Sequence, residues 1–158
     1  MTFLYSTLSG PENVPARDAS ELLGIARGLP RWDALIIVAE NDNYPRLHVT
    51  WHEGHGFVVH CFEDGESWGF FLTEAASFSS PEVEIEMGGQ ALEKWPRQLF
   101  ADSERALEAL DFFLKTGKQN GMQHWVRTDA FPREIVWEGR EAREAWEKSR
   151  EKKDRDDD

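Results

Sequence analysis

The residues from Asp102 to Gly117 constrain the fold most, because they predict an amphipathic helix whose single apolar stripe has to be covered. Asp102 or Ser103 can accept hydrogen bonds from the first backbone N–H groups, and Gly117 supplies the left-handed residue that ends many helices. The apolar side chains recur at steps of three and four residues: Ala106, Leu107, Leu110, Phe113 and Leu114. One stripe predicts a helix packed on one face of a sheet, built from the strand-like segments on either side.

The segments before this helix predict an antiparallel meander. Residues 46–52 alternate between apolar and polar side chains, as in a half-buried strand. Residues 57–62 and 68–72 follow after turns rich in Gly, Glu and Asp, and strands joined by tight turns pair antiparallel. Residues 34–40, ALIIVAE, are continuously apolar up to Glu40 and predict a strand buried on both faces at the centre of the sheet.

The rest of the chain completes one α+β domain. The other predicted elements are a short edge strand (3–5), a first helix capped by Asp18 (18–27), a strand (82–87), two short strands (123–128 and 134–137) and a charged last helix (140–152). Residues 90–100 are interpreted as irregular. We therefore expect a single domain over residues 1–152, an antiparallel sheet with helices packed on one face. Residues 153–158 are expected to be a disordered acidic tail.

Charge and cysteine content narrow the class of protein. The formal net charge is −12, whereas a nucleic-acid-binding protein needs Lys and Arg for phosphate contacts. The one cysteine, Cys61, excludes an intramolecular disulfide and favours a reducing compartment. The first residues lack the basic and apolar regions of a signal peptide, and no apolar stretch reaches the ~18 residues of a membrane span. We expect a cytoplasmic protein with neither a nucleic-acid nor a membrane partner.

The sequence contains no recognised catalytic motif. GxSxG, GxxxxGK[ST], GxGxxG and CxxC are all absent. His60 is badly placed to activate Cys61, because neighbours on a strand face opposite sides, so Cys61 is interpreted as a buried structural residue. We therefore assign no catalytic residue and no cofactor, and favour a binding protein over an enzyme.

The histidines support one alternative to this interpretation, a metal-binding enzyme. His48, His52, His55, His60 and Cys61 fall within fourteen residues, and His48 and His52 lie on the same face of the predicted strand. Zinc requires that its ligands converge at about 2 Å from one ion. The favoured interpretation is a polar strand face without metal, and the alternative is a small metal-binding enzyme that uses His48, His52 and His60.

The stretch from Glu82 to Trp137 resembles the Imm1 family of bacterial immunity proteins. The resemblance lies in a Glu-rich strand ending at Gly88-Gly89, a loop with Pro96, a helix with a Thr116-Gly117 stop, and a following strand that ends in Trp. The helix positions that match are Ala106, Leu110 and Phe113. The step from the Gly to the final Trp is longer here than in the family, and both Trp125 and Trp137 fit as its counterpart.

The resemblance implies a protein that neutralises a cognate toxin by tight binding, such as a nucleic-acid deaminase or nuclease with a basic substrate surface. A negatively charged face would then cover the toxin's active site. The family has no catalytic motif to carry over, so the predicted contacts follow from charge and from the role of Trp at interfaces. They are Glu63, Asp64, Glu66 and Trp68, together with Glu82, Glu84 and Glu86. A regulatory scaffold without a toxin partner is a further alternative.

Overall fold

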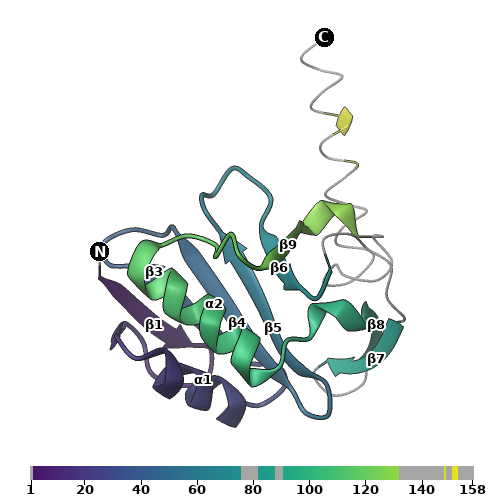
Figure 1. Cartoon of the computed structure of the whole chain (residues 1–158), viewed down its shortest axis with the longest axis horizontal. Coiled ribbons are helices and arrows are strands. Elements are labelled where there is room, and N and C mark those ends of the chain that lie inside the picture. The colour runs from purple at the N-terminus through teal and green to yellow at the C-terminus, as the bar shows by residue number, and fades with distance from the viewer. Residues whose placement is uncertain (1, 76–81, 88–90, 132–147, 149–150, 153–158) are drawn as a thin grey trace.

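The computed structural model describes residues 2–75, 82–87, 91–131, 148 and 151–152. The strands within them are β1 (Phe3–Thr7), β2 (Val14–Ala16), β3 (Leu35–Ala39), β4 (Arg46–His52), β5 (Gly56–Phe62), β6 (Phe70–Thr73), β7 (Glu82–Met87), β8 (Ala91–Pro96) and β9 (His124–Arg127). The helices are α1 (Ala19–Gly28) and α2 (Ser103–Thr116), with short 3-10 turns η1 (Arg97–Leu99) and η2 (Thr128–Ala130). The order β2-β1-β3-β4-β5-β6-β9 forms one antiparallel sheet, and β7 and β8 form a second (Figure 1).

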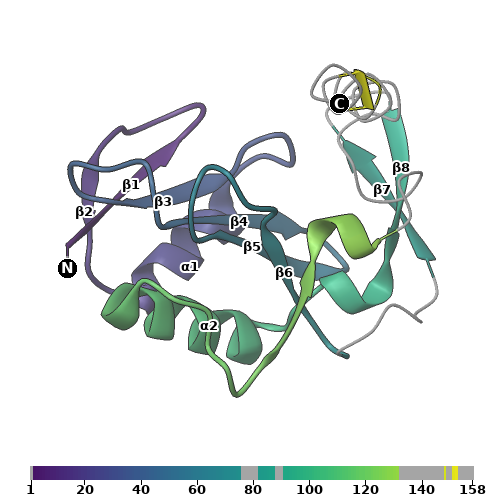
Figure 2. The same ribbon diagram turned by 90° about the horizontal axis from the view of Figure 1, so that it is seen from above.

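The predicted helices at 18–27 and 102–117 are confirmed, together with their caps. Asp102 accepts a hydrogen bond from the backbone N–H of Arg105 at 2.8 Å, and Gly117 ends α2 with φ of 71°. The Gly117 N–H donates to the carbonyl of Phe113 at 2.7 Å. Asp18 caps α1 by accepting from two N–H groups of its first turn. Figure 2 shows both helices on one face of the seven-stranded sheet, so the predicted α+β architecture is also confirmed.

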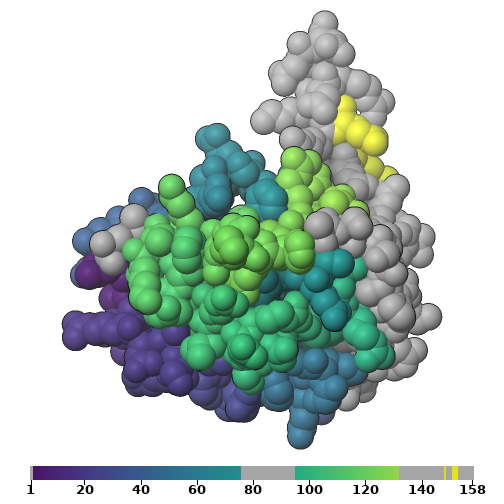
Figure 3. All heavy atoms as spheres, viewed as in Figure 1, coloured from purple at the N-terminus to yellow at the C-terminus, as the bar shows by residue number. Residues whose placement is uncertain are grey.

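The helix-side core fills the space between this face and the two helices. Figure 3 shows the side chains of α1 and α2 side by side on this side of the molecule. The buried strand residues of this core are Phe3, Leu35, Ile37, Leu47, Val49, Phe57, Val59 and Leu72. On α2 the predicted stripe is wrong at Leu107, which is 36% exposed, whereas Ala109 is buried. Each residue turns a helix by about 100°, which places Leu107 farther from the centre of the stripe than Ala109.

Two predictions about the sheet are wrong in detail. The outward side chains of β3 are only half-buried, so β3 is covered on one face, and β4 rather than β3 holds the middle position. β1 is not an edge strand, because β2 pairs with it after the turn at Gly10 and Pro11. A short strand that contains Pro15 suits an edge, since proline cannot donate a hydrogen bond to a further strand.

The interpretation of residues 90–100 as irregular is wrong for residues 91–99, which form β8 and η1, and this segment contributes Trp95, Leu99 and Phe100 to a second core. β8 pairs with β7 from Glu82 opposite Pro96 to Met87 opposite Ala91, and η1 follows. This second core lies on the sheet face opposite the helices and consists of Val58, Phe71, Trp95, Leu99, Phe100, Val126 and Phe131. β8 pairs with β7 alone, and a strand with a single partner tolerates polar residues and proline. Its sequence therefore lacks the apolar alternation from which a strand is predicted.

Several predicted segments lie outside the described residues. These are the strand at 134–137 with Trp137, and the acidic tail at 153–158. Of the last predicted helix, residues 148, 151 and 152 are described and are helical. Trp125 lies within β9, and its indole N–H donates to the carbonyl of Asn120 at 3.0 Å. In the part of the chain that is described, no helix has both the length and the apolar character needed to cross a membrane.

Hydrogen bonds to the Asp33 side chain connect the residues that follow β1 with the start of β3. Its side chain is buried and accepts from the backbone N–H groups of Leu8 at 2.7 Å, Ser9 at 3.1 Å and Ala34 at 2.7 Å, and from the Ser9 hydroxyl. Burial alone would raise the pKa of Asp33, but these hydrogen bonds outweigh it and hold the pKa below its usual value. The ionised carboxylate is therefore a structural acceptor.

We expect Asp33→Asn to lower the free energy of unfolding by about 2 to 3 kcal/mol, because an amide turns a donor toward groups that are themselves donors. The matched control is Glu108→Gln, which removes one charge from an exposed site on α2. Urea denaturation at pH 7 measures both variants. Equal midpoints would contradict the role assigned to Asp33.

Candidate functional site

Two exposed loops come together at one end of the seven-stranded sheet. Arg46 is opposite Phe62 in the register, so the loop before β4 (residues 40–45) emerges beside the loop after β5 (residues 63–67). The loops touch, because a Cβ added to Gly65 would lie 2.9 Å from a ring carbon of Tyr44. We call their exposed carboxylates the acidic end. Its members are Glu40, Asp42, Glu63, Asp64 and Glu66.

Asp64 holds the second loop in one shape. Its carboxylate accepts from the backbone N–H groups of Ser67 at 2.7 Å and Glu66 at 2.9 Å, and from the Ser67 hydroxyl at 3.2 Å. The hydrogen bond from the Ser67 N–H contributes most to a lowered pKa of Asp64, so this carboxylate stays ionised. Glu63 and Glu66 flank the turn with exposed side chains. The loop thus presents its charges from a hydrogen-bonded turn.

The first loop is ordered in the same way. Asp42 accepts from the backbone N–H groups of Asn43 at 2.7 Å and Tyr44 at 3.4 Å. The Tyr44 ring, which the second loop touches at Gly65, also lies against the Arg46 guanidinium, 5.5 Å from the ring centre. Neither loop contains Lys or Arg. A surface lined by one sign of charge attracts groups of the opposite sign.

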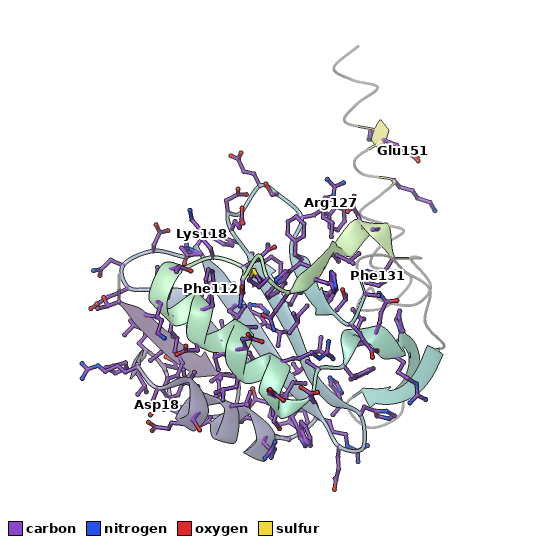
Figure 4. All side chains as sticks on the ribbon, viewed as in Figure 1. Asp18, Phe112, Lys118, Arg127, Phe131 and Glu151 are labelled. Atoms are coloured by element: carbon purple, nitrogen blue, oxygen red, sulfur yellow. The ribbon has the colours of Figure 1, made fainter. Side chains whose placement is uncertain are left out.

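A nearby basic side chain is paired. Arg127 lies at the same end of the sheet, because it is opposite Phe70, which is opposite Cys61. Its guanidinium donates to both carboxylate oxygens of Asp129, at 2.6 and 2.5 Å. Figure 4 shows Arg127 where β9 meets η2. This ion pair limits how far Arg127 can offset the negative charge of the acidic end.

The predicted partner-binding residues separate into two groups. Glu63, Asp64 and Glu66 share one loop, and Trp68 lies half-buried where that loop leads into β6. The second group, Glu82, Glu84 and Glu86, lies on β7, and Figures 1 and 2 both show β7 apart from the β5–β6 loop. In the register Glu84 is opposite Lys94 of β8. The structure therefore does not combine the seven residues into one patch.

Sequence reasoning missed Glu40 and Asp42. The predicted meander could have identified them, because in an antiparallel pair the residues before one strand lie beside those that follow its partner. The Asn and Asp residues at 41–43 by themselves indicate only a turn between two strands. Its neighbour in space is the loop that contains Glu63, which is about twenty residues away in the chain.

His48 and His60 form a pair on the sheet face opposite the helices. They are opposite each other on β4 and β5, and the His60 ring stacks on Phe71 with centroids 3.9 Å apart. The Thr128 hydroxyl donates to the carbonyl of Gly69 at 3.0 Å, so it accepts from Nε2 of His60 at 2.7 Å. Burial lowers the pKa of His48 to about 4 and that of His60 to about 3. Both imidazoles are therefore neutral at pH 7.

His52 lies in a different environment. Its ring is buried beside Trp95 and Phe100, with centroids 5.6 Å from each, and burial lowers its pKa to about 4. Among the described residues, no three His, Cys, Asp or Glu side chains are placed to hold a metal ion. The three histidines of the metal alternative thus do not form a ligand set there.

Cys61 belongs to the helix-side core. Its side chain is fully buried, and burial raises its pKa to about 12. A nucleophilic thiol needs the opposite shift, because the thiolate is the reactive form. The predicted burial of Cys61 is confirmed.

Comparison with protein-family models gives no match for this chain, and comparison with curated proteins gives none. The resemblance to the Imm1 family thus depends on the motif between Glu82 and Trp137 alone.

Proposed function

We propose that this chain is a cytoplasmic immunity protein that binds a cognate bacterial toxin and covers its active site. The toxin would act on nucleic acid, as a deaminase or nuclease does. The observation that carries the proposal is the acidic end, where two touching loops without Lys or Arg present five exposed carboxylates. A toxin that acts on nucleic acid needs Lys and Arg around its substrate, and these side chains are suitable partners for such a surface.

Order in the loops favours this kind of binding. The internal hydrogen bonds of Asp42 and Asp64 fix both loops in the free protein, so little conformational entropy remains to be lost when a partner binds. Exposed carboxylates also accelerate encounter with a basic protein, most strongly at low ionic strength. The proposed role needs no catalytic group of its own.

Reversal of charge at the acidic end tests the proposal. We expect the double variant Glu63→Lys/Glu66→Lys to bind the toxin encoded by the adjacent gene about 10- to 100-fold more weakly, because like charges would now face each other. Co-expression of the toxin measures protection in cells, and titration of the purified proteins at two salt concentrations measures affinity.

The matched control is Glu53→Lys/Glu108→Lys, which changes the net charge equally. Glu53 lies in the β4–β5 hairpin at the other end of the sheet, and Glu108 lies on the exposed side of α2. The control is expected to keep protecting cells. Equal protection by both double variants would show that the acidic end is not the contact surface.

A further inference from the structure

The sheet has a second face that the helices do not cover. Outward side chains of β1, of β3 and of β4 as far as Thr50 are half-buried, whereas most of their inward neighbours are almost completely buried. We call these outward residues the open face. They are Leu4, Ser6, Ile36, Val38, Arg46, His48 and Thr50, with Phe62 at the end of β5. Figure 2 shows α1 and α2 on the other side of the sheet.

The second core covers only part of this side. It reaches Val58 on β5, which is 4% exposed, and continues toward Phe71 and Val126 on β6 and β9. Toward β3, Thr50 is opposite Val58 but is half-buried, and so are Ile36 and Val38. The boundary between covered and open residues therefore runs along β4 and β5.

Half of the residues of the open face are apolar, and the face adjoins the acidic end. Val38 and Arg46 are opposite each other next to the first loop, and Phe62 precedes the second loop directly. His48 contacts Phe62 with ring centroids 5.1 Å apart and is uncharged at pH 7. Arg46 is the one cation among the residues that define the open face. An apolar floor with carboxylates along one edge is the arrangement expected of an interface core and its polar rim.

We infer that the open face is the floor of the toxin-docking surface and that the acidic end is its rim. A basic protein face would place apolar side chains against Ile36 and Val38 while its Lys and Arg side chains meet Glu63 and Glu66. This inference depends on the proposed function and extends it, because it assigns the greater part of the contact to a surface whose one charged defining residue is Arg46. Buried apolar contacts rather than rim charges usually dominate the free energy of binding.

Cysteine footprinting tests the inference with little disturbance of the fold. Val38→Cys and Ile36→Cys each place a small apolar thiol on the open face, and Leu107→Cys places one on α2, beyond the helix-side core. Cys61 does not interfere, because it is fully buried and its pKa is raised to about 12. The rate of alkylation by N-ethylmaleimide is measured for each variant, alone and with the toxin encoded by the adjacent gene.

Bound toxin is expected to slow alkylation at positions 38 and 36 by about tenfold or more and to leave position 107 unchanged, because a thiol in an interface reacts only after dissociation. If the toxin binds but positions 38 and 36 react at the free rate, the open face is not the floor, and the acidic end alone remains as the contact. If the adjacent gene product does not bind, the proposed function fails and this inference fails with it.

Discussion

Acidification from pH 7 to pH 4 is expected to remove most of the thermodynamic stability of this protein. Three histidines are held neutral by burial: His48 and His52 with pKa values of about 4, and His60 with a pKa of about 3. Each lies well below the ordinary value of about 6.5 that applies to the unfolded chain. Folding therefore has to exclude protons that the unfolded chain binds.

The sign of the effect follows from proton linkage. Above pH 6.5 these imidazoles are neutral in both states, and their contribution to stability is fully present. As the pH falls toward 4, the unfolded chain gains protons that the folded protein does not, so unfolding becomes easier. A difference of this size corresponds to about 3 kcal/mol for each histidine. Three such losses together are comparable to the whole free energy of unfolding of a typical domain, which is ~5 to 15 kcal/mol.

Urea denaturation at half-unit steps between pH 7 and pH 4 measures this dependence. His52→Phe is expected to reduce the loss of unfolding free energy over that range by about 3 kcal/mol, because one proton-binding site is removed from the unfolded chain. His52 suits this test, since its neighbours Trp95 and Phe100 are aromatic. His124→Gln, at an exposed position on β9, is the control and should follow the wild type. An identical acid dependence in His52→Phe would exclude His52 as a cause.

Local patterns were sufficient to predict the helices and the meander. The caps at Asp18, Asp102 and Gly117 and the alternation in β4 depend on neighbouring residues, which the sequence displays directly. β8 escaped prediction because it has one strand partner and its polar residues and Pro96 disguise the pattern. The apolar run in β3 suggested burial on both faces, but apolar composition does not reveal whether anything covers the second face.

The candidate site could also be predicted only where it depends on neighbouring residues in the chain. Glu63, Asp64 and Glu66 were identified from the loop itself, whereas Glu40 and Asp42 became part of the site only through the contact of Tyr44 with Gly65. Contacts of that kind join residues far apart in the chain. The position of β7 could not be predicted from local sequence either. β7 belongs to the two-stranded sheet with β8 and not to the meander, so its acidic residues lie apart from those of the β5–β6 loop.

Gly56→Ala is expected to lower the free energy of unfolding more than the same change at Gly54, the other glycine of the β4–β5 hairpin. Gly56 has φ of +133°, and an added Cβ would lie 2.6 Å from the carbonyl oxygen of Ala101. That carbonyl accepts the Phe57 N–H at 2.9 Å, and the Ala101 N–H donates to the Phe57 carbonyl at 2.7 Å. Because the new Cβ would clash with a backbone atom, the Ala101 carbonyl has to move away. That movement would break the pair of hydrogen bonds that joins β5 to the residues just before α2.

Two controls separate the clash from backbone strain. Gly54→Ala has φ of +82° at its site and no atom within 4 Å of the new Cβ, so it should cost about 1 kcal/mol from strain alone. Gly24→Ala, in an open position on α1, should gain about 0.5 to 1 kcal/mol. Gly56→Ala should lose more than about 3 kcal/mol of unfolding free energy, from strain and the broken hydrogen bonds together. A loss no greater than that of Gly54→Ala would mean that Ala101 can withdraw freely, and that this pair of hydrogen bonds does not fix the start of α2 against the sheet.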